Sequence, residues 1–244
     1  MHIKCFRLWN DLPNEKMALS RFGEVFRCSR GAVIGMIHVK ALPGTPMNHH
    51  GVEELVEMAC SQAQIYKEAE IILAGGNQEA LAVSKACGFQ FIRAECFIFS
   101  HVADEGLMDG CAGPLLRYRR AIGAEDVLVF ADIKKKHSAH SITSDVTIVE
   151  TAQAANFFLA DGVIITGSAT GQEADHTQLH DVLQNVDLPV LIGSGVTKTN
   201  VHKFMDANGF IVGSHFKTGG RWTGELEYDK VKSFTDLVKS LRAN

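Results

Sequence analysis

Residues 188–217 read LPVLIGSGVTKTNVHKFMDANGFIVGSHFK, and this stretch contains the pattern that decides the fold. Two short apolar runs, Pro189–Ile192 and Phe210–Val212, each end in a turn that contains glycine. A helix is expected between them, at Asn200–Ala207. Unbroken apolar runs that alternate with helices are typical of a parallel sheet whose outer face is covered by helices.

The same alternation continues outward from this stretch through the rest of the chain. Further strands are predicted at Ala32–Val39, Ile71–Ala74, Phe89–Phe99, Val127–Lys134 and Val163–Thr166. Such an order builds either a closed barrel or an open, doubly wound sheet. The length of 244 residues and the two adjacent glycine turns at the last strands favour the barrel. We therefore predict an α/β fold, a TIM-type parallel (β/α)8 barrel, of which only seven strands are recognisable.

One helix-to-strand junction lacks a turn. The predicted helix Glu53–Glu68 continues through Ala69 and Glu70 directly into Ile71, without Gly, Pro or Asn. The other junctions each carry a turn residue, namely Gly88, Gly123, Gly162, Pro189 and Gly209. Because one β–α unit of such a barrel takes roughly 30 residues, we predict that about one unit is absent near Glu68 to Ile71 and that the barrel is incomplete.

Composition limits the class of protein and its partners. Hydrophobic residues make up 46% of the chain and charged residues 21%, which is enough to build a sizeable core. The net charge of −4 argues against nucleic acid or an anionic membrane as the main partner. No apolar run reaches the roughly 18 residues of a transmembrane helix. The six scattered cysteines form no C-x-x-C pair and indicate a reducing compartment.

The first thirty residues are basic and are interspersed with apolar residues. Mitochondrial transit peptides share this pattern but avoid acids, whereas Asp11, Glu15 and Glu24 occur here. We therefore predict an N-terminal extension at 1–30 and a barrel domain at 31–244. The expected location is the cytoplasm, with the mitochondrial matrix as the alternative.

Polar residues are predicted to converge at the carboxyl ends of the strands. Because side chains alternate along a strand, every second residue shares a face, and on three strands such a face begins apolar and ends polar. The three faces are Ile34, Met36 and His38; Phe91, Arg93 and Glu95; and Phe130, Asp132 and Lys134. Active sites of barrels lie at this end. We predict a catalytic group of His38, Arg93, Glu95, Asp132 and Lys134. The alternative is an ion-pair network with a purely structural role.

The two glycine turns predict a phosphate site. Backbone N–H groups at such turns bind anions, and glycine lets the ligand approach closely. The candidate phosphate-binding residues are Gly193, Ser194, Gly195, Gly213, Ser214 and Lys217. The loop after the fifth strand can add contacts to the same ligand through Thr166, Gly167, Thr170 and Gly171. The alternatives are glycines that only permit tight turns, and a loop that is merely flexible.

A metal site is less well specified. His137 and His140 lie three residues apart beside Asp132, but zinc needs three or four convergent ligands. We predict no cofactor and retain a divalent metal at these histidines as an alternative.

Taken together, these motifs resemble the BtpA family, and its animal branch in particular. The matching stretches are Ile34–Pro46 (IGMIHVKALPGTP), Phe91–Gly106 (FIRAECFIFSHVADEG), Gly113–Arg120 (GPLLRYRR), Val129–Ser138 (VFADIKKKHS), Asp161–Gly171 (DGVIITGSATG), Pro189–Asn200 (PVLIGSGVTKTN) and Gly209–Lys217 (GFIVGSHFK). The resemblance implies a barrel of the ribulose-phosphate-binding type. The family takes its name from a cyanobacterial factor needed for photosystem I accumulation, and other members are regarded as enzymes of sugar or nucleoside metabolism.

The resemblance also implies a set of functional residues, and the chain departs from the family pattern at one place. The polar signature of the family falls on His38, Arg93, Glu95, Asp132, Lys134, His137, Thr166, Gly167, Gly171, Ser194, Gly195, Asn200, Gly213 and Lys217; Asn200 joins the substrate-binding candidates on this ground. The family has a further β–α unit after its first helix, and this chain lacks that unit between Glu68 and Ile71, as a splice variant would.

Two functions follow as hypotheses. The first is an enzyme, or former enzyme, that binds a small phosphorylated metabolite of the sugar- or nucleoside-phosphate type, with acid–base and lyase- or hydrolase-like chemistry. The second is a non-catalytic assembly or stability factor that binds a protein partner. A homo-oligomer is compatible with either.

Overall fold

The structure is a computed structural model that describes residues 21–243, apart from positions 39, 42, 67–75 and 105. The strands of its main sheet are β1 (Ala32–Gly35), β2 (Phe91–Ala94), β5 (Leu128–Ile133), β7 (Gly162–Ile165), β8 (Val190–Ile192) and β9 (Gly209–Val212). The helices around it are α1 (Arg21–Phe26), α2 (Val52–Ile65), α3 (Asn77–Cys87), α4 (Ala112–Ala121), α5 (Ile148–Phe157), α6 (His176–Asn185) and α7 (Tyr228–Arg242).

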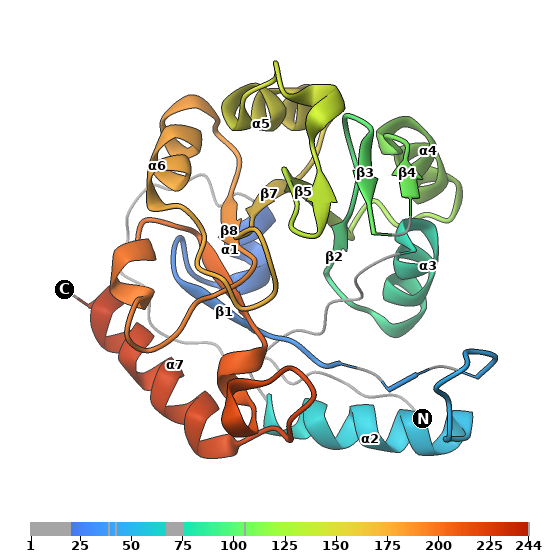
Figure 1. Cartoon of the computed structure of the whole chain (residues 1–244), viewed down its shortest axis with the longest axis vertical. Helices are drawn as coiled ribbons and strands as arrows, with labels where there is room; N and C mark the ends of the chain where they lie inside the picture. Colours follow the sequence, from blue (N-terminus) through green and yellow to red (C-terminus); the bar gives the residue numbers. More distant parts are fainter. Residues whose placement is uncertain (1–20, 39, 42, 67–75, 105, 244) are drawn as a thin grey trace.

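The six strands form one parallel sheet in the order β1-β9-β8-β7-β5-β2, and the sheet curls into a partial barrel (Figure 1). The first strand pairs with the last, so that Ala32 lies opposite Gly209 and Ile34 opposite Ile211. This pairing of the two ends of the chain closes the barrel on one side. The predicted barrel is therefore confirmed, with six strands among the described residues.

Among the described residues, β1 and β2 are the two edge strands of the sheet and do not pair with each other. In an eight-stranded barrel of this order, two more strands would lie between them. One place corresponds to the predicted strand Ile71–Ala74, which lies outside the described residues, as does the predicted gap from Glu68 to Ile71. No other strand of the main sheet occurs between Gly35 and Phe91 in the described part of the chain.

The core has two parts. Inside the curled sheet, a cluster is built from alternate strand residues such as Ile34, Phe91 and Phe130. A larger cluster lies between the sheet and the outer helices, with Leu115, Val182 and other fully buried side chains. Apolar residues on both faces explain why the strands are unbroken apolar runs in the sequence.

The short helix α1 fills the amino end of the barrel. Phe22 is 2% exposed and belongs to the interior cluster. The rings of Phe22 and Phe26 pack on Phe130, with centroids 6.1 Å and 6.4 Å away, and Arg21 forms a 2.6 Å ion pair with Asp161. The described part of the predicted extension thus packs as part of the barrel; the boundary at residue 30 stays a prediction.

A small second sheet and several short 3-10 turns lie at the carboxyl end of the barrel. A second, antiparallel sheet has the order β4-β3-β6, with β3 at His101–Ala103, β4 at Gly106–Met108 and β6 at Ser138–Ala139. Short 3-10 turns occur at Ser141–Thr143, Val201–Phe204, Ser214–Phe216 and Thr218–Gly220. The predicted helix at Asn200–Ala207 is therefore a single 3-10 turn. Among the described residues, no helix combines the length and apolarity needed to cross a bilayer.

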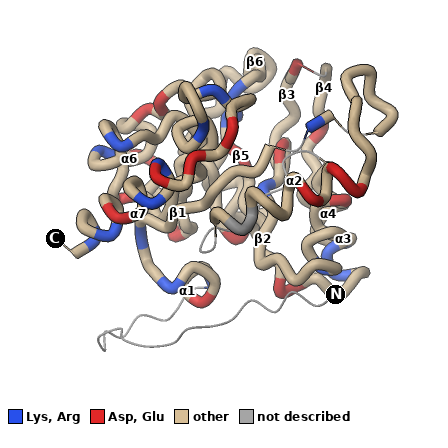
Figure 2. The backbone as a smooth tube through the Cα atoms, turned by 90° about the horizontal axis from the view of Figure 1, so that it is seen from below, with Lys and Arg blue, Asp and Glu red and all other residues tan. Residues whose placement is uncertain are grey.

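Basic and acidic residues are interspersed along the described backbone (Figure 2). This distribution agrees with the small net charge of −4.

Candidate functional site

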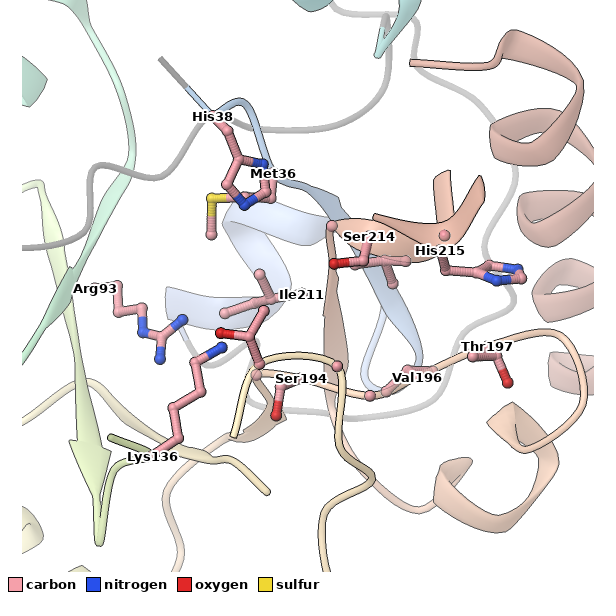
Figure 3. A pocket seen from close by; sticks show the side chains of 17 residues that line it. Met36, His38, Arg93, Lys136, Ser194, Val196, Thr197, Ile211, Ser214 and His215 are labelled. Carbon is pink, nitrogen blue, oxygen red and sulfur yellow. The ribbon is translucent and has the colours of Figure 1, made fainter. Parts of the chain in front are cut away.

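A cavity of about 190 Å³ opens at the carboxyl ends of β8, β9, β1 and β2 (Figure 3). Nine of the residues predicted from the sequence line it: His38, Arg93, Thr170, Gly171, Gly193, Ser194, Gly195, Gly213 and Ser214. The two glycine turns that follow β8 and β9 therefore share one cavity with residues from three other loops.

The two turns offer backbone donors that are not otherwise used. Among the described residues, the amides of Gly195, Val196, Ser214 and His215 donate to no carbonyl or side chain. All four residues line the cavity. Unpaired amides grouped in this way are what an anion requires.

The glycines of the β8 turn also have packing roles. Gly195 has a φ of +72°, and a Cβ there would overlap the carbonyl of Gln172. At Gly193, a Cβ would overlap the side chain of Ile164. Tight packing of the turns therefore accounts for these two glycines, and their identity alone does not demonstrate a ligand.

Several predicted binding residues hold the loops in place, and two of them, Asn200 and Thr166, do not line the cavity. The Asn200 side chain accepts from the amide of Thr197 at 2.7 Å and donates to the carbonyl of Gly195 at 2.9 Å. Thr166 Oγ1 accepts from the amide of Lys136 at 2.9 Å. The Ser194 hydroxyl, at the cavity wall, accepts from the amide of Gly167 at 3.0 Å. These bonds fix the loops after β5, β7 and β8 relative to one another.

The acidic candidates are held in ion pairs. Arg93 donates from Nε and Nη2 to the two oxygens of Asp132 at 2.7 Å and 2.9 Å, and both side chains are buried. Burial by itself would lower the pKa of Arg93, but the charge and hydrogen bonds of Asp132 raise it overall. Glu95 pairs with the buried Lys135 at 3.0 Å. Of these four side chains, only Arg93 lines the cavity.

Three consecutive lysines have three different surroundings. Lys134 has a φ of +49°, which interrupts the strand alternation. Its Nζ donates to the carbonyl of Thr143 at 2.7 Å, away from the cavity. Lys135 pairs with Glu95, and Lys136 lines the cavity. The prediction that Lys134 shares a face with Asp132 and points into the cavity is therefore not met, because the backbone turns at Lys134.

His38 is the candidate proton-transfer residue at the cavity wall. Burial, followed by the positive charges of Lys217 and Lys136, lowers the pKa of His38 to about 4. Its imidazole is therefore neutral at pH 7. The Nδ1 atom is buried and has no hydrogen-bond partner among the described residues.

Three further predicted residues, Lys217, His137 and His140, do not line the cavity. Lys217 is 3% exposed and does not line it; burial lowers its pKa. His137 Nε2 lies 2.8 Å from Thr170 Oγ1, and His140 Nε2 lies 3.0 Å from the carbonyl of Lys135. No group of three His, Cys, Asp or Glu side chains suited to a metal occurs among the described residues.

Sequence reasoning missed Lys136 and His215 at the cavity wall. A run of three lysines does not indicate which of them faces inward, and His215 lies one position beyond the predicted turn. The catalytic and binding roles of the residues predicted from the sequence stay predictions.

The fold defines a TIM-type parallel α/β barrel. The chain superposes with a TM-score of 0.58 on (S)-3-O-geranylgeranylglyceryl phosphate synthase of Thermoplasma acidophilum, solved with its substrate sn-glycerol-1-phosphate. That match covers 93% of this chain and 100% of the synthase at 14% identity, so it concerns the fold alone. The sequence pattern of the BtpA family matches residues 70–240. The chain belongs to the BtpA family.

Two relatives support this assignment. An uncharacterised mitochondrial protein of Caenorhabditis elegans, F13E9.13, is 42% identical, and the alignment covers 90% of this chain and 97% of the worm protein. The photosystem I biogenesis protein BtpA of Synechocystis is 33% identical over 68% of this chain and 58% of its own length. The worm relative agrees with the predicted resemblance to the animal branch.

The lengths of the worm alignment support the missing unit. The alignment has 268 positions, and 90% of the 244 residues of this chain is about 220, so about 48 positions have no counterpart here. This number is large enough for one β–α unit of roughly 30 residues. The family match begins at residue 70, beside the predicted gap.

Proposed function

We propose that this BtpA-family barrel binds a small phosphorylated metabolite of the sugar- or nucleoside-phosphate type. The observation that carries the proposal is the group of four unpaired amides, at Gly195, Val196, Ser214 and His215, around one cavity. Backbone amides bind a phosphate oxygen without a charged side chain and discriminate against cations. The barrel neighbour solved with a glycerol phosphate is consistent with this class of ligand.

For acid–base chemistry at this cavity, we propose His38 as the group that exchanges a proton. Asp132 and Glu95 are each held by a cationic partner, whereas His38 lines the cavity and forms no ion pair with any described residue. A general acid or base must lie within hydrogen-bond reach of the reacting atom. The absent unit removes one loop from the same mouth of the barrel. We therefore propose ligand binding for this chain, and turnover for relatives with the full barrel.

The test changes charge at the anion site without changing size. In Ser214→Asp, a carboxylate would lie beside the amides and repel phosphate; Ser214→Asn has the same shape and no charge. Titration calorimetry with inorganic phosphate and with glycerol 3-phosphate should give at least about a tenfold weaker affinity for the Asp variant than for the Asn variant, since like charges in contact cost several kcal/mol. Equal affinities for the two variants would refute the phosphate site.

A second candidate function is that of a non-catalytic factor with a protein partner. Its support is an apolar group at the end of α5, where Phe157, Phe158 and Leu159 are 81%, 48% and 69% exposed. Such groups mark interaction surfaces when they form a contiguous patch. If the partner is a second copy of this chain, Leu159→Glu should shift sedimentation toward a smaller species while leaving phosphate binding unchanged. Identical sedimentation of the wild type and this variant would count against self-association through this surface.

The cellular location stays a prediction. The name of the worm relative places that protein in mitochondria, which favours the mitochondrial alternative over the cytoplasm for this chain.

A further inference from the structure

Lys136 brings a positive charge to the cavity wall that no described residue pairs. Four charged side chains act on Lys136, namely Arg93, Asp132, Glu95 and Lys135. They pair with each other, Arg93 with Asp132 and Lys135 with Glu95. These four charges cancel, and the ammonium of Lys136 has no ion pair or hydrogen bond with any described residue. A half-buried ammonium without a counter-ion is unfavourable unless a ligand supplies one.

The ammonium group of Lys136 lies at one side of the cavity. Lys136 and Arg93 lie on one side, and Thr197 and His215 lie on the other, beside the unpaired amides (Figure 3). The hydrogen bond from the Lys136 amide to Thr166 anchors the base of the lysine. Burial, and then the charge of Arg93, lowers the pKa of Lys136, while Asp132 and Glu95 oppose this shift. His38 on the same wall is neutral at pH 7 and adds no charge.

We infer that Lys136, with Arg93 beside it, forms a second anion subsite, and that the ligand is a short phosphorylated carboxylic acid. This inference rests on the proposed phosphate function of the two glycine turns. The phosphate would occupy the amides of the β8 and β9 turns, and the carboxylate would be the missing counter-ion of Lys136. Arg93 has the Nη1 group, which makes no hydrogen bond to Asp132, to offer to the same carboxylate.

The size of the cavity favours a carboxylate over a second phosphate. Its volume of about 190 Å³ is below the roughly 300–1,000 Å³ of sites for drug-sized ligands. A phosphate at one end leaves room for a few carbon atoms and a planar carboxylate. The subsite therefore favours short phosphorylated acids over nucleoside phosphates and uncharged sugar phosphates.

The experiment compares ligands that differ in the carboxylate alone. 3-Phosphoglycerate is matched with glycerol 3-phosphate, and 2-phosphoglycolate with ethyl phosphate, which tests two distances between the charged ends. Calorimetry on the full chain should show that the wild type binds at least one acid about tenfold tighter than its neutral match, the effect expected of a charge-assisted hydrogen bond.

Variants separate the charge of Lys136 from the charge of the whole rim. Lys136→Met should reduce the preference for the acid to about twofold or less, and Lys136→Arg should retain most of it because Arg is also cationic. Lys198→Met removes a charge from an exposed lysine beside the cavity and should leave the preference unchanged. Circular dichroism on each variant verifies the fold.

The outcomes distinguish the two proposals. If the phosphate esters bind but neither acid binds tighter, the second subsite is refuted and the phosphate site stands. The same holds if folded Lys136→Met keeps the full preference. If neither inorganic phosphate nor any of the four ligands binds to the wild type, the phosphate site fails and the second subsite fails with it.

Discussion

The Arg93–Asp132 ion pair allows a sharp test of what stabilises the mouth of the barrel. We predict that Asp132→Leu strongly destabilises the fold. The two side chains are 4% and 0% exposed and share two hydrogen bonds at 2.7 Å and 2.9 Å. Leucine branches at the same atom as Asp, is larger, and makes no hydrogen bond. The variant would leave a buried guanidinium without its counter-ion and with Lys136 nearby.

The expected loss of stability is large because removing one partner of a buried ion pair costs more than replacing both partners. Removal of one partner from a buried ion pair typically costs about 3–5 kcal/mol, because the other charge stays desolvated. This loss is a large part of the roughly 5–15 kcal/mol that stabilises a typical domain. For a chain of this size, it corresponds to a fall in Tm of roughly 6–20 °C.

Urea denaturation followed by circular dichroism measures this loss, and the double variant supplies the control. Arg93→Met with Asp132→Leu removes both charges and should restore most of the stability, since apolar pairs of similar volume often replace buried ion pairs at little cost. A loss below about 1 kcal/mol for Asp132→Leu would refute the reasoning. The reasoning would also be refuted if the loss of stability in the double variant equalled the sum of the losses in the two single variants.

Two further predictions concern the turn after β8 and the plug at the amino end of the barrel. Gly195→Ala should destabilise the fold by about 2–5 kcal/mol in urea denaturation, the sum of left-handed backbone strain and overlap with Gln172. Gly171→Ala is its control, because Gly171 has a φ of +80° and nothing within 4 Å, so only about 1–2 kcal/mol of strain is expected; equal losses would show that the overlap is unimportant. Phe22→Ala should cost about 3–5 kcal/mol as a buried aromatic, whereas Phe157→Ala, 81% exposed in the wild type, should stay within about 0.5 kcal/mol. A Phe22 variant as stable as the wild type would mean that α1 does not plug the barrel.

Much of the fold could be predicted from local pattern. All six described strands of the main sheet overlap predicted apolar runs, because a strand buried on both faces must be largely apolar. β7 and β9 begin one residue earlier than predicted, at Gly162 and Gly209, which were expected in turns. The short sheet β4-β3-β6 could not be predicted, since its strands have only two or three residues each. The plug α1 was assigned to an extension because six residues are too few to carry a clear periodicity.

The glycine-turn side of the candidate site could be predicted from sequence better than its charged side. Gly193 to Gly195 and Gly213 with Ser214 were found from sequence, because glycine-rich turns after consecutive parallel strands must lie side by side at one edge of the sheet. The charged side of the cavity was less accessible to such reasoning. Pairing of Arg93 with Asp132, and of Glu95 with Lys135, depends on side chains from neighbouring strands. Lys136 was not found at all.

Local order was thus already encoded along the chain: where strands and helices occur, where turns interrupt them, and where one turn is missing before Ile71. These features depend on backbone propensity and on the alternation of buried faces, which neighbouring residues decide. The tertiary structure alone decided which charges cancel and which remains. Pairing is a matter of distances between separate strands, and a left-handed residue at Lys134 redirects the three lysines to three different surroundings. The surplus charge at Lys136, on which the inferred ligand depends, is a property of that arrangement and not of any stretch of sequence.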